Sequence, residues 1–146
     1  KKSGYPGMKI LQFAFDSREE SDYLPHNYTH NCVVYTGTHD NDTVMGWYDT
    51  LKGADKKLCD DYLRLKNADG EPIPREQLPW EFVRAAMSSV ADLAIIPMQD
   101  YLGLGSEARI NIPSTLGINW KWRMGNGDFT KELAGRIRSM TKLYGR

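Results

Sequence analysis

The chain has 146 residues, of which 40% are hydrophobic, so it can form one globular domain with a sizeable core and is too apolar to be disordered. Its 19 Lys and Arg balance 19 Asp and Glu, which leaves no electrostatic basis for capturing nucleic acid or an anionic membrane surface. We therefore expect a neutral ligand, with no nucleic-acid and no membrane partner.

The two cysteines, Cys32 and Cys59, are far apart in the sequence, and we expect both to be reduced thiols in the core. No stretch is long and apolar enough to span a membrane, and the first residues lack the apolar segment of a signal peptide. These features predict a cytoplasmic protein. The opening Lys1-Lys2-Ser3-Gly4 is more typical of the end of a helix than of a start, so we expect the chain to be part of a longer one.

The first half of the chain predicts two strands and a short helix. An apolar run at 8–15 follows a Pro-Gly turn, and a polar connection leads to a second apolar run at 32–36. Both runs have the length and composition of buried strands. Asp42 is a good N-cap residue, so we expect it to cap a helix over 43–48.

The second half predicts three helices and one strand. Apolar residues recur on one helical face over 55–66, and a further helix is expected over 80–90. A third strand is expected over 93–97, where a proline stops it. A connection rich in Gly and Asn, from 101 to 128, leads to a last helix over 130–144.

The order of these elements, strand, strand, helices, strand and helix, predicts an α/β fold with parallel strands. We find no linker and no internal repeat, so we expect residues 1–146 to form a single unit without a second domain. A (β/α)₈ TIM barrel takes about 250 residues and eight strands. If the chain belongs to such a barrel, it supplies only the closing part.

A polar cluster follows the second predicted strand, in the run VVYTGTHDNDT at 33–43. Reactive side chains collect where parallel strands end, which makes His39 and Asp40 candidates for an active site. The same residues can also form an ordinary Asx-turn and helix cap. A calcium-binding EF-hand is excluded, because Val44 and Met45 stand where a ligand and a glycine are needed.

This run resembles the fourth signature region of the α-amylase clan, in the version found in amylomaltases, which are 4-α-glucanotransferases also called disproportionating enzymes. The resemblance extends along nearly the whole chain and follows the order of that family's sixth, seventh and eighth barrel strands. The similar segments are 6–15, 23–28, 33–43, 46–48, 97–105, 109–113 and 119–123.

The resemblance implies a retaining glycosyl transfer, which needs a nucleophile and a general acid/base about 5–5.5 Å apart. In the clan these two carboxylates follow the fourth and fifth strands, neither of which is in this chain. Asp40 matches the third carboxylate, which stabilises the transition state, and His39 matches a neighbour that hydrogen-bonds the sugar. No cofactor is implied.

Two amides, Gln99 and Asn111, are expected in the polar rim after the eighth strand, where they can bind glucan hydroxyls or simply make turns. Trp120 and Trp122 are two residues apart, so in an extended segment their side chains face the same side. They could stack against a sugar or pack in the core, and we favour the core. His26 and His30 are four apart, but Pro25 and the lack of a helical pattern argue against a metal site.

The first hypothesis is therefore the C-terminal part of a 4-α-glucanotransferase, acting on α-1,4-glucans and maltooligosaccharides in the cytoplasm, or in a plastid if the source is a plant. The alternative is a non-catalytic domain that binds glucan or a protein partner. The isolated chain should lack activity. Without the N-terminal part of the barrel, its open sheet should also make it self-associate.

Overall fold

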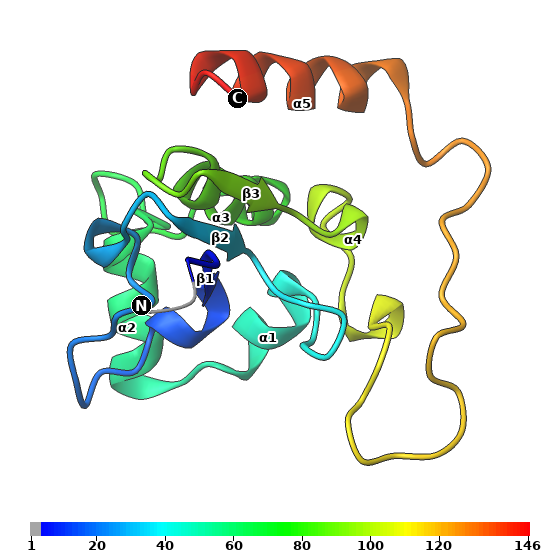
Figure 1. Cartoon of the computed structure of the whole chain (residues 1–146), viewed down its shortest axis with the longest axis horizontal. Coiled ribbons are helices and arrows are strands. Elements are labelled where there is room, and N and C mark those ends of the chain that lie inside the picture. The colour runs from blue at the N-terminus through cyan, green and yellow to red at the C-terminus, as the bar shows by residue number, and fades with distance from the viewer. Residues whose placement is uncertain (1–3) are drawn as a thin grey trace.

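The computed structural model describes residues 4–146. Its sheet consists of three short strands, β1 (Gly7–Ile10), β2 (Cys32–Tyr35) and β3 (Leu93–Ile95), and both pairings are parallel. The strands are adjacent in chain order, β1-β2-β3. The α/β architecture with three parallel strands and surrounding helices is thus confirmed (Figure 1).

The helices lie mostly to one side of this small sheet. An extended segment leads around the molecule to α5, which lies apart from the strands (Figure 1). The α-helices are α1 (Val44–Thr50), α2 (Gly53–Tyr62), α3 (Leu78–Met87), α4 (Met98–Tyr101) and α5 (Lys131–Leu143). The 3-10 helices are η1 (Leu11–Ala14), η2 (Pro25–Asn27), η3 (Arg75–Gln77) and η4 (Ser106–Ala108).

The first strand is shorter than the apolar run that predicted it. β1 ends at Ile10, and the chain turns at once into η1. Leu11 and Ala14 are buried in this turn, so the run stays apolar although the strand has ended. The expectation of a strand over 8–15 was therefore wrong in its second half. A short apolar run is compatible with a buried strand and with a buried helical turn, so its pattern alone does not distinguish the two.

Three other boundaries also differ from expectation. Helix α2 ends at Tyr62 rather than at 66, because Arg64 adopts a left-handed conformation with φ 57° and breaks the helix. Helix α3 begins before Trp80 and ends at Met87, with Pro79 in its first turn, where a missing N–H costs nothing. Strand β3 stops at Ile95, two residues before the proline.

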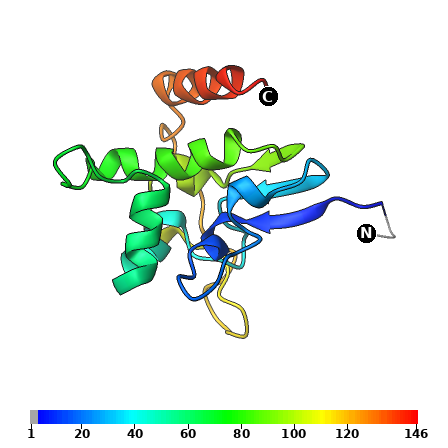
Figure 2. The ribbon, with the colours of Figure 1, turned by 90° about the vertical axis from the view of Figure 1, so that its left-hand side faces the viewer.

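The last helix matches the prediction closely. α5 spans Lys131–Leu143, and the hydroxyl of Thr130 caps it by accepting a hydrogen bond from the Leu133 N–H at 3.1 Å. It packs against α3 through a cluster that joins Met140 to Trp80, and the Arg136 guanidinium lies 3.9 Å from the centre of the Trp80 ring. Figure 2 shows α5 on the far side of α3 from β1.

The two faces of the sheet have very different surroundings. On one face Cys32 and Val34 are buried, and Ala86 of α3 packs in the same cluster. On the other face Met8, Leu93 and Ile95 are 58%, 51% and 41% exposed. The sheet is therefore covered by helices on one side and carries open apolar side chains on the other.

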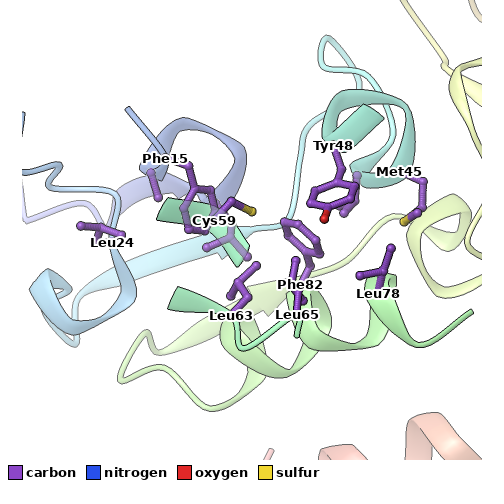
Figure 3. Packing of buried hydrophobic residues seen from close by; sticks show 12 residues of the cluster. Phe15, Leu24, Met45, Tyr48, Cys59, Leu63, Leu65, Leu78 and Phe82 are labelled. Carbon is purple, nitrogen blue, oxygen red and sulfur yellow. The ribbon is translucent and has the colours of Figure 1, made fainter. Parts of the chain in front are cut away.

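The main core surrounds Phe82, which is fully buried in the middle of α3 (Figure 3). The ring centres of Trp47 and Tyr48 lie 5.9 Å and 6.1 Å from that of Phe82, both in edge-on geometry.

Cys59 belongs to this core, where burial raises the pKa of its thiol. Both cysteines are free and buried, as expected. Within residues 4–146, no helix is long and apolar enough to cross a membrane.

Replacing Phe82 by Ala should lower the free energy of unfolding by about 3–5 kcal/mol, because it empties the centre of the main core. Urea denaturation followed by circular dichroism measures this change. The control is Phe129→Ala at an exposed ring, which should alter the free energy by less than about 0.5 kcal/mol. Equal losses for the two variants would contradict the packing described above.

Candidate active site

The loops that follow β2 and β3 meet at the same edge of the sheet. Residues 36–43 connect β2 to α1, while the chain beyond β3 passes through α4 and η4 to residues 109–111. The Ser106 hydroxyl donates to Asp42 Oδ2 at 2.6 Å, which joins the two connections directly. Parallel strands place their carboxyl ends together, so this edge is where an α/β fold builds a site.

Asp40 stands at the centre of this edge, with its side chain 48% exposed. The side-chain amide of Asn111 donates to Asp40 Oδ1 at 2.7 Å, and His39 Nε2 lies 3.3 Å from the same oxygen. Three of the four predicted site residues are thus in contact. Because both contacts are to Oδ1, the carboxylate is held at one oxygen and Oδ2 is not used by either neighbour.

Arg109 holds the two loops together through their backbones. Its Nη2 donates to the carbonyl oxygen of Asp40 at 2.8 Å, and its Nε donates to that of Asn111 at 2.9 Å. Sequence reasoning missed this role, since Arg109 lies 69 residues from Asp40 along the chain. The signal in the sequence was its place at the start of the family-like segment 109–113, two residues before Asn111.

Gln99 lies near the site, and its side chain is bound to the chain beyond α4. Its side chain is buried in α4, and its amide nitrogen donates to the carbonyl of Ala108 at 3.2 Å. With His39 and Arg109 it lines a small cavity beneath the loops. The structure therefore places Gln99 in the wall of the site and the other three predicted residues at its surface.

Trp120 lies beside His39 rather than in the core. The two ring centres are 5.0 Å apart, and Trp120 is 56% exposed. The backbone N–H of Trp120 donates to the carbonyl of Ile110 at 2.7 Å, which closes residues 110–120 into a loop and brings the indole back to the site. The expected core position was wrong for Trp120, and Trp122 is only half-buried, because this loop follows the surface.

Asp42 does not cap α1, contrary to expectation. The cap is Thr43, whose hydroxyl accepts a hydrogen bond from the Gly46 N–H at 3.1 Å. Asp42 instead accepts from the Thr43 N–H and from the Ser106 hydroxyl. A Cβ at Gly46 would lie 2.7 Å from the Asp42 carboxylate, so the glycine permits this close approach.

A buried glutamine supports the loop from below. Gln12 Nε2 donates to the backbone carbonyl of Asp42 at 2.8 Å, and Gly37 leaves room for that amide. A Cβ at Gly37 would lie 2.4 Å from Gln12 Nε2. The turn at η1, which shortened the predicted first strand, is what places Gln12 under the loop.

The described part of the chain offers no evident metal centre. Among residues 4–146, no three His, Cys, Asp or Glu side chains gather as metal ligands would. His26 lies against Tyr62, with Nδ1 2.9 Å from the hydroxyl, and His30 lies 3.9 Å from Asp92. The two histidines have different neighbours.

The sequence of the chain is similar to that of proteins of known family. A family model described as 4-alpha-glucanotransferase matches residues 1–128. The chain belongs to the 4-alpha-glucanotransferase family. A 4-alpha-glucanotransferase of Clostridium butyricum is 50% identical across the whole chain, which spans 29% of that relative. A chloroplastic/amyloplastic 4-alpha-glucanotransferase of Arabidopsis thaliana is 46% identical, and the chain spans 25% of it.

A solved structure of the family shares the fold. The amylomaltase from Streptococcus agalactiae in complex with acarbose superimposes with a TM-score of 0.89 at 36% sequence identity. The match covers 99% of this chain and 28% of that one. The chain therefore spans less than a third of the length of these relatives.

Replacing Gly37 by Ala should destabilise the protein by about 1–3 kcal/mol, because the new methyl group displaces the Gln12 amide and leaves the part-buried carbonyl of Asp42 without its donor. The matched control is Gly135→Ala in α5, where a Cβ meets no atom within 4 Å. That change should stabilise by about 0.5–1 kcal/mol through helix propensity. Thermal unfolding measures the stability of both variants. A change of stability in the same direction in both would contradict the close approach at Gly37.

Proposed function

We propose that this chain is part of a 4-α-glucanotransferase that moves a segment of one α-1,4-glucan to the 4-hydroxyl of another glucan or of glucose, with retention and without a cofactor. Family membership supports the chemistry. The observation that carries the proposal is the half-exposed carboxylate of Asp40 in the loop after β2, held at one oxygen by Asn111 and His39.

The three strands correspond, in this proposal, to strands six to eight of a (β/α)₈ barrel, and residues 1–146 form its C-terminal portion without a second domain. The open face of the sheet supports this position, because Met8, Leu93 and Ile95 would point into a barrel interior, which is normally filled by apolar side chains. The remaining strands are the missing partner, and they would bring the nucleophile and the acid/base.

Asp40 would act on the transition state rather than on the bound ground state. As the sugar ring flattens toward an oxocarbenium-like form, a fixed carboxylate can tighten its hydrogen bonds to the ring hydroxyls. Asn111 and His39 hold Oδ1, so Oδ2 is the oxygen that would meet the sugar. Such a group accelerates the reaction because its orientation is set before the substrate binds.

His39, Asn111 and Gln99 are the proposed substrate-binding residues. The imidazole of His39 is exposed beside Asp40 and packs on Trp120, which fixes its plane. Asn111 keeps its side-chain oxygen for a sugar hydroxyl while its nitrogen holds Asp40. Gln99 would contribute from the wall of the site. The bound acarbose in the S. agalactiae amylomaltase supports a glucan as the ligand class.

A non-catalytic domain that binds glucan or a protein partner is the second candidate, favoured by the apolar side chains that the open sheet face exposes. The cytoplasm is the proposed compartment, or a plastid in a plant. Three of the relatives carry the description chloroplastic/amyloplastic.

The full-length protein should convert maltotriose into glucose and longer maltooligosaccharides, and Asp40→Asn should lower its kcat about 10²–10³-fold with little change in folding. The control is Asp92→Asn, an exposed carboxylate next to the amino end of β3, which should leave kcat unchanged. Chromatography of the products measures both. Glucan binding without any transfer would favour the second candidate, and an undiminished kcat in Asp40→Asn would remove Asp40 from the mechanism.

The isolated chain should show no transfer and should self-associate through the open sheet face, because exposed apolar sheet surface seeks partners. Leu93→Lys on that face should shift light scattering toward the monomer. The control is Leu143→Lys, at an exposed leucine on α5, which should leave the light scattering unchanged. A monomer at high concentration for the unaltered chain would contradict the proposed role of this face.

A further inference from the structure

One buried carboxylate binds both ends of the loop that carries Asp40. Asp100, in α4, is 2% exposed. Its Oδ2 accepts a hydrogen bond from the Thr36 hydroxyl at 2.5 Å, and its Oδ1 accepts one from the Val44 N–H at 2.9 Å. Thr36 is the last residue before the loop and Val44 the first residue of α1 after it.

The loop between these two anchors is residues 37–43, and it contains His39 and Asp40. Thr36 and Val44 are both fully buried, so neither anchor can be replaced by water. A single carboxylate from another strand connection therefore fixes where the loop begins and where it ends. Arg109 and Ser106 hold points within the loop, but neither contacts its ends.

We infer that Asp100 is a positioning residue for Asp40, which through Thr36 and Val44 sets the placement of the catalytic loop against the glucan. This inference rests on the proposed function of Asp40. Displacing a reacting group by about 1 Å can cost about 10²-fold in rate, so a restraint on both ends of its loop has a direct catalytic consequence.

The electrostatics of Asp100 support a functional reason for its presence. Burial raises the pKa of Asp100 to about 6, and the donated hydrogen bonds from Thr36 and Val44 oppose that rise. The charged or titratable neighbours around the same cavity are Asp42, which raises the pKa further, His39 and Arg109. Because the pKa is higher than in the unfolded chain, the ionised group reduces folding stability as the pH rises toward 6, a cost that packing alone would not require.

The experiment compares Thr36→Val with Thr36→Ser in the full-length protein. Valine removes the hydroxyl at nearly constant volume, while serine keeps it. Thr36→Val should lower kcat for maltotriose transfer about 10- to 100-fold with KM little changed, and Thr36→Ser should restore kcat. Amide hydrogen exchange of residues 37–43 should rise about tenfold in the valine variant only, because the loop loses one of its buried anchors.

The pH profile of kcat separates positioning from a loss of stability. The Thr36 hydroxyl lowers the pKa of Asp100, so Thr36→Val should move the acid limb, near pH 6, to higher pH. Asp100→Asn carries a neutral side chain at every pH, so it should show the lowered kcat of the protonated enzyme throughout and should lack that limb. This variant decides the question if Thr36→Val does not fold.

An acid limb that stays in place in both variants would overturn the inference, and so would unchanged hydrogen exchange in Thr36→Val. If the unaltered full-length protein transfers no glucan, the proposed function fails instead. The exchange of residues 37–43 would then still show whether Asp100 restrains the loop.

Discussion

Helix α3 is the constraint on which the sheet and the loops depend, because its side chains belong to all three buried clusters. Phe82 fills the main core, Ala86 packs on the covered face of the sheet, and Val83 packs toward α5. A close-packed interior transmits displacement, so a shift of this helix would move the strands. The position of the candidate site, at the ends of β2 and β3, therefore depends on the position of α3.

The site itself is held mostly by hydrogen bonds between side chains and backbone. Arg109 binds the carbonyls of Asp40 and Asn111, Gln12 binds that of Asp42, and Asp100 binds the N–H of Val44. Such bonds fix the path of the loop, while the side chains of His39, Asp40 and Asn111 contact one another instead. The consequence is a loop whose geometry is set before any substrate arrives, which is the condition for electrostatic stabilisation of a transition state.

The sheet separates a structural side from an open side. The covered face is closed by α3, and the opposite face exposes Met8, Leu93 and Ile95. The chain spans 29% and 25% of the length of the two relatives named above, and in the proposed barrel that face would point toward the interior. The polar edge and the apolar face are next to each other. In the proposed barrel, the candidate site would therefore lie at one end of the apolar interior.

The sequence by itself determined the parallel α/β order, the last helix and the loop with His39 and Asp40, because each follows from local periodicity or from a contiguous motif. It did not determine the turn at Leu11–Ala14, the cap at Thr43 or the outward position of Trp120. The roles of Asp100 and Arg109 also required the tertiary structure, because their partners lie 56 to 69 residues away. Local patterns cannot report which distant carboxylate fills a buried gap, since only packing brings such groups together.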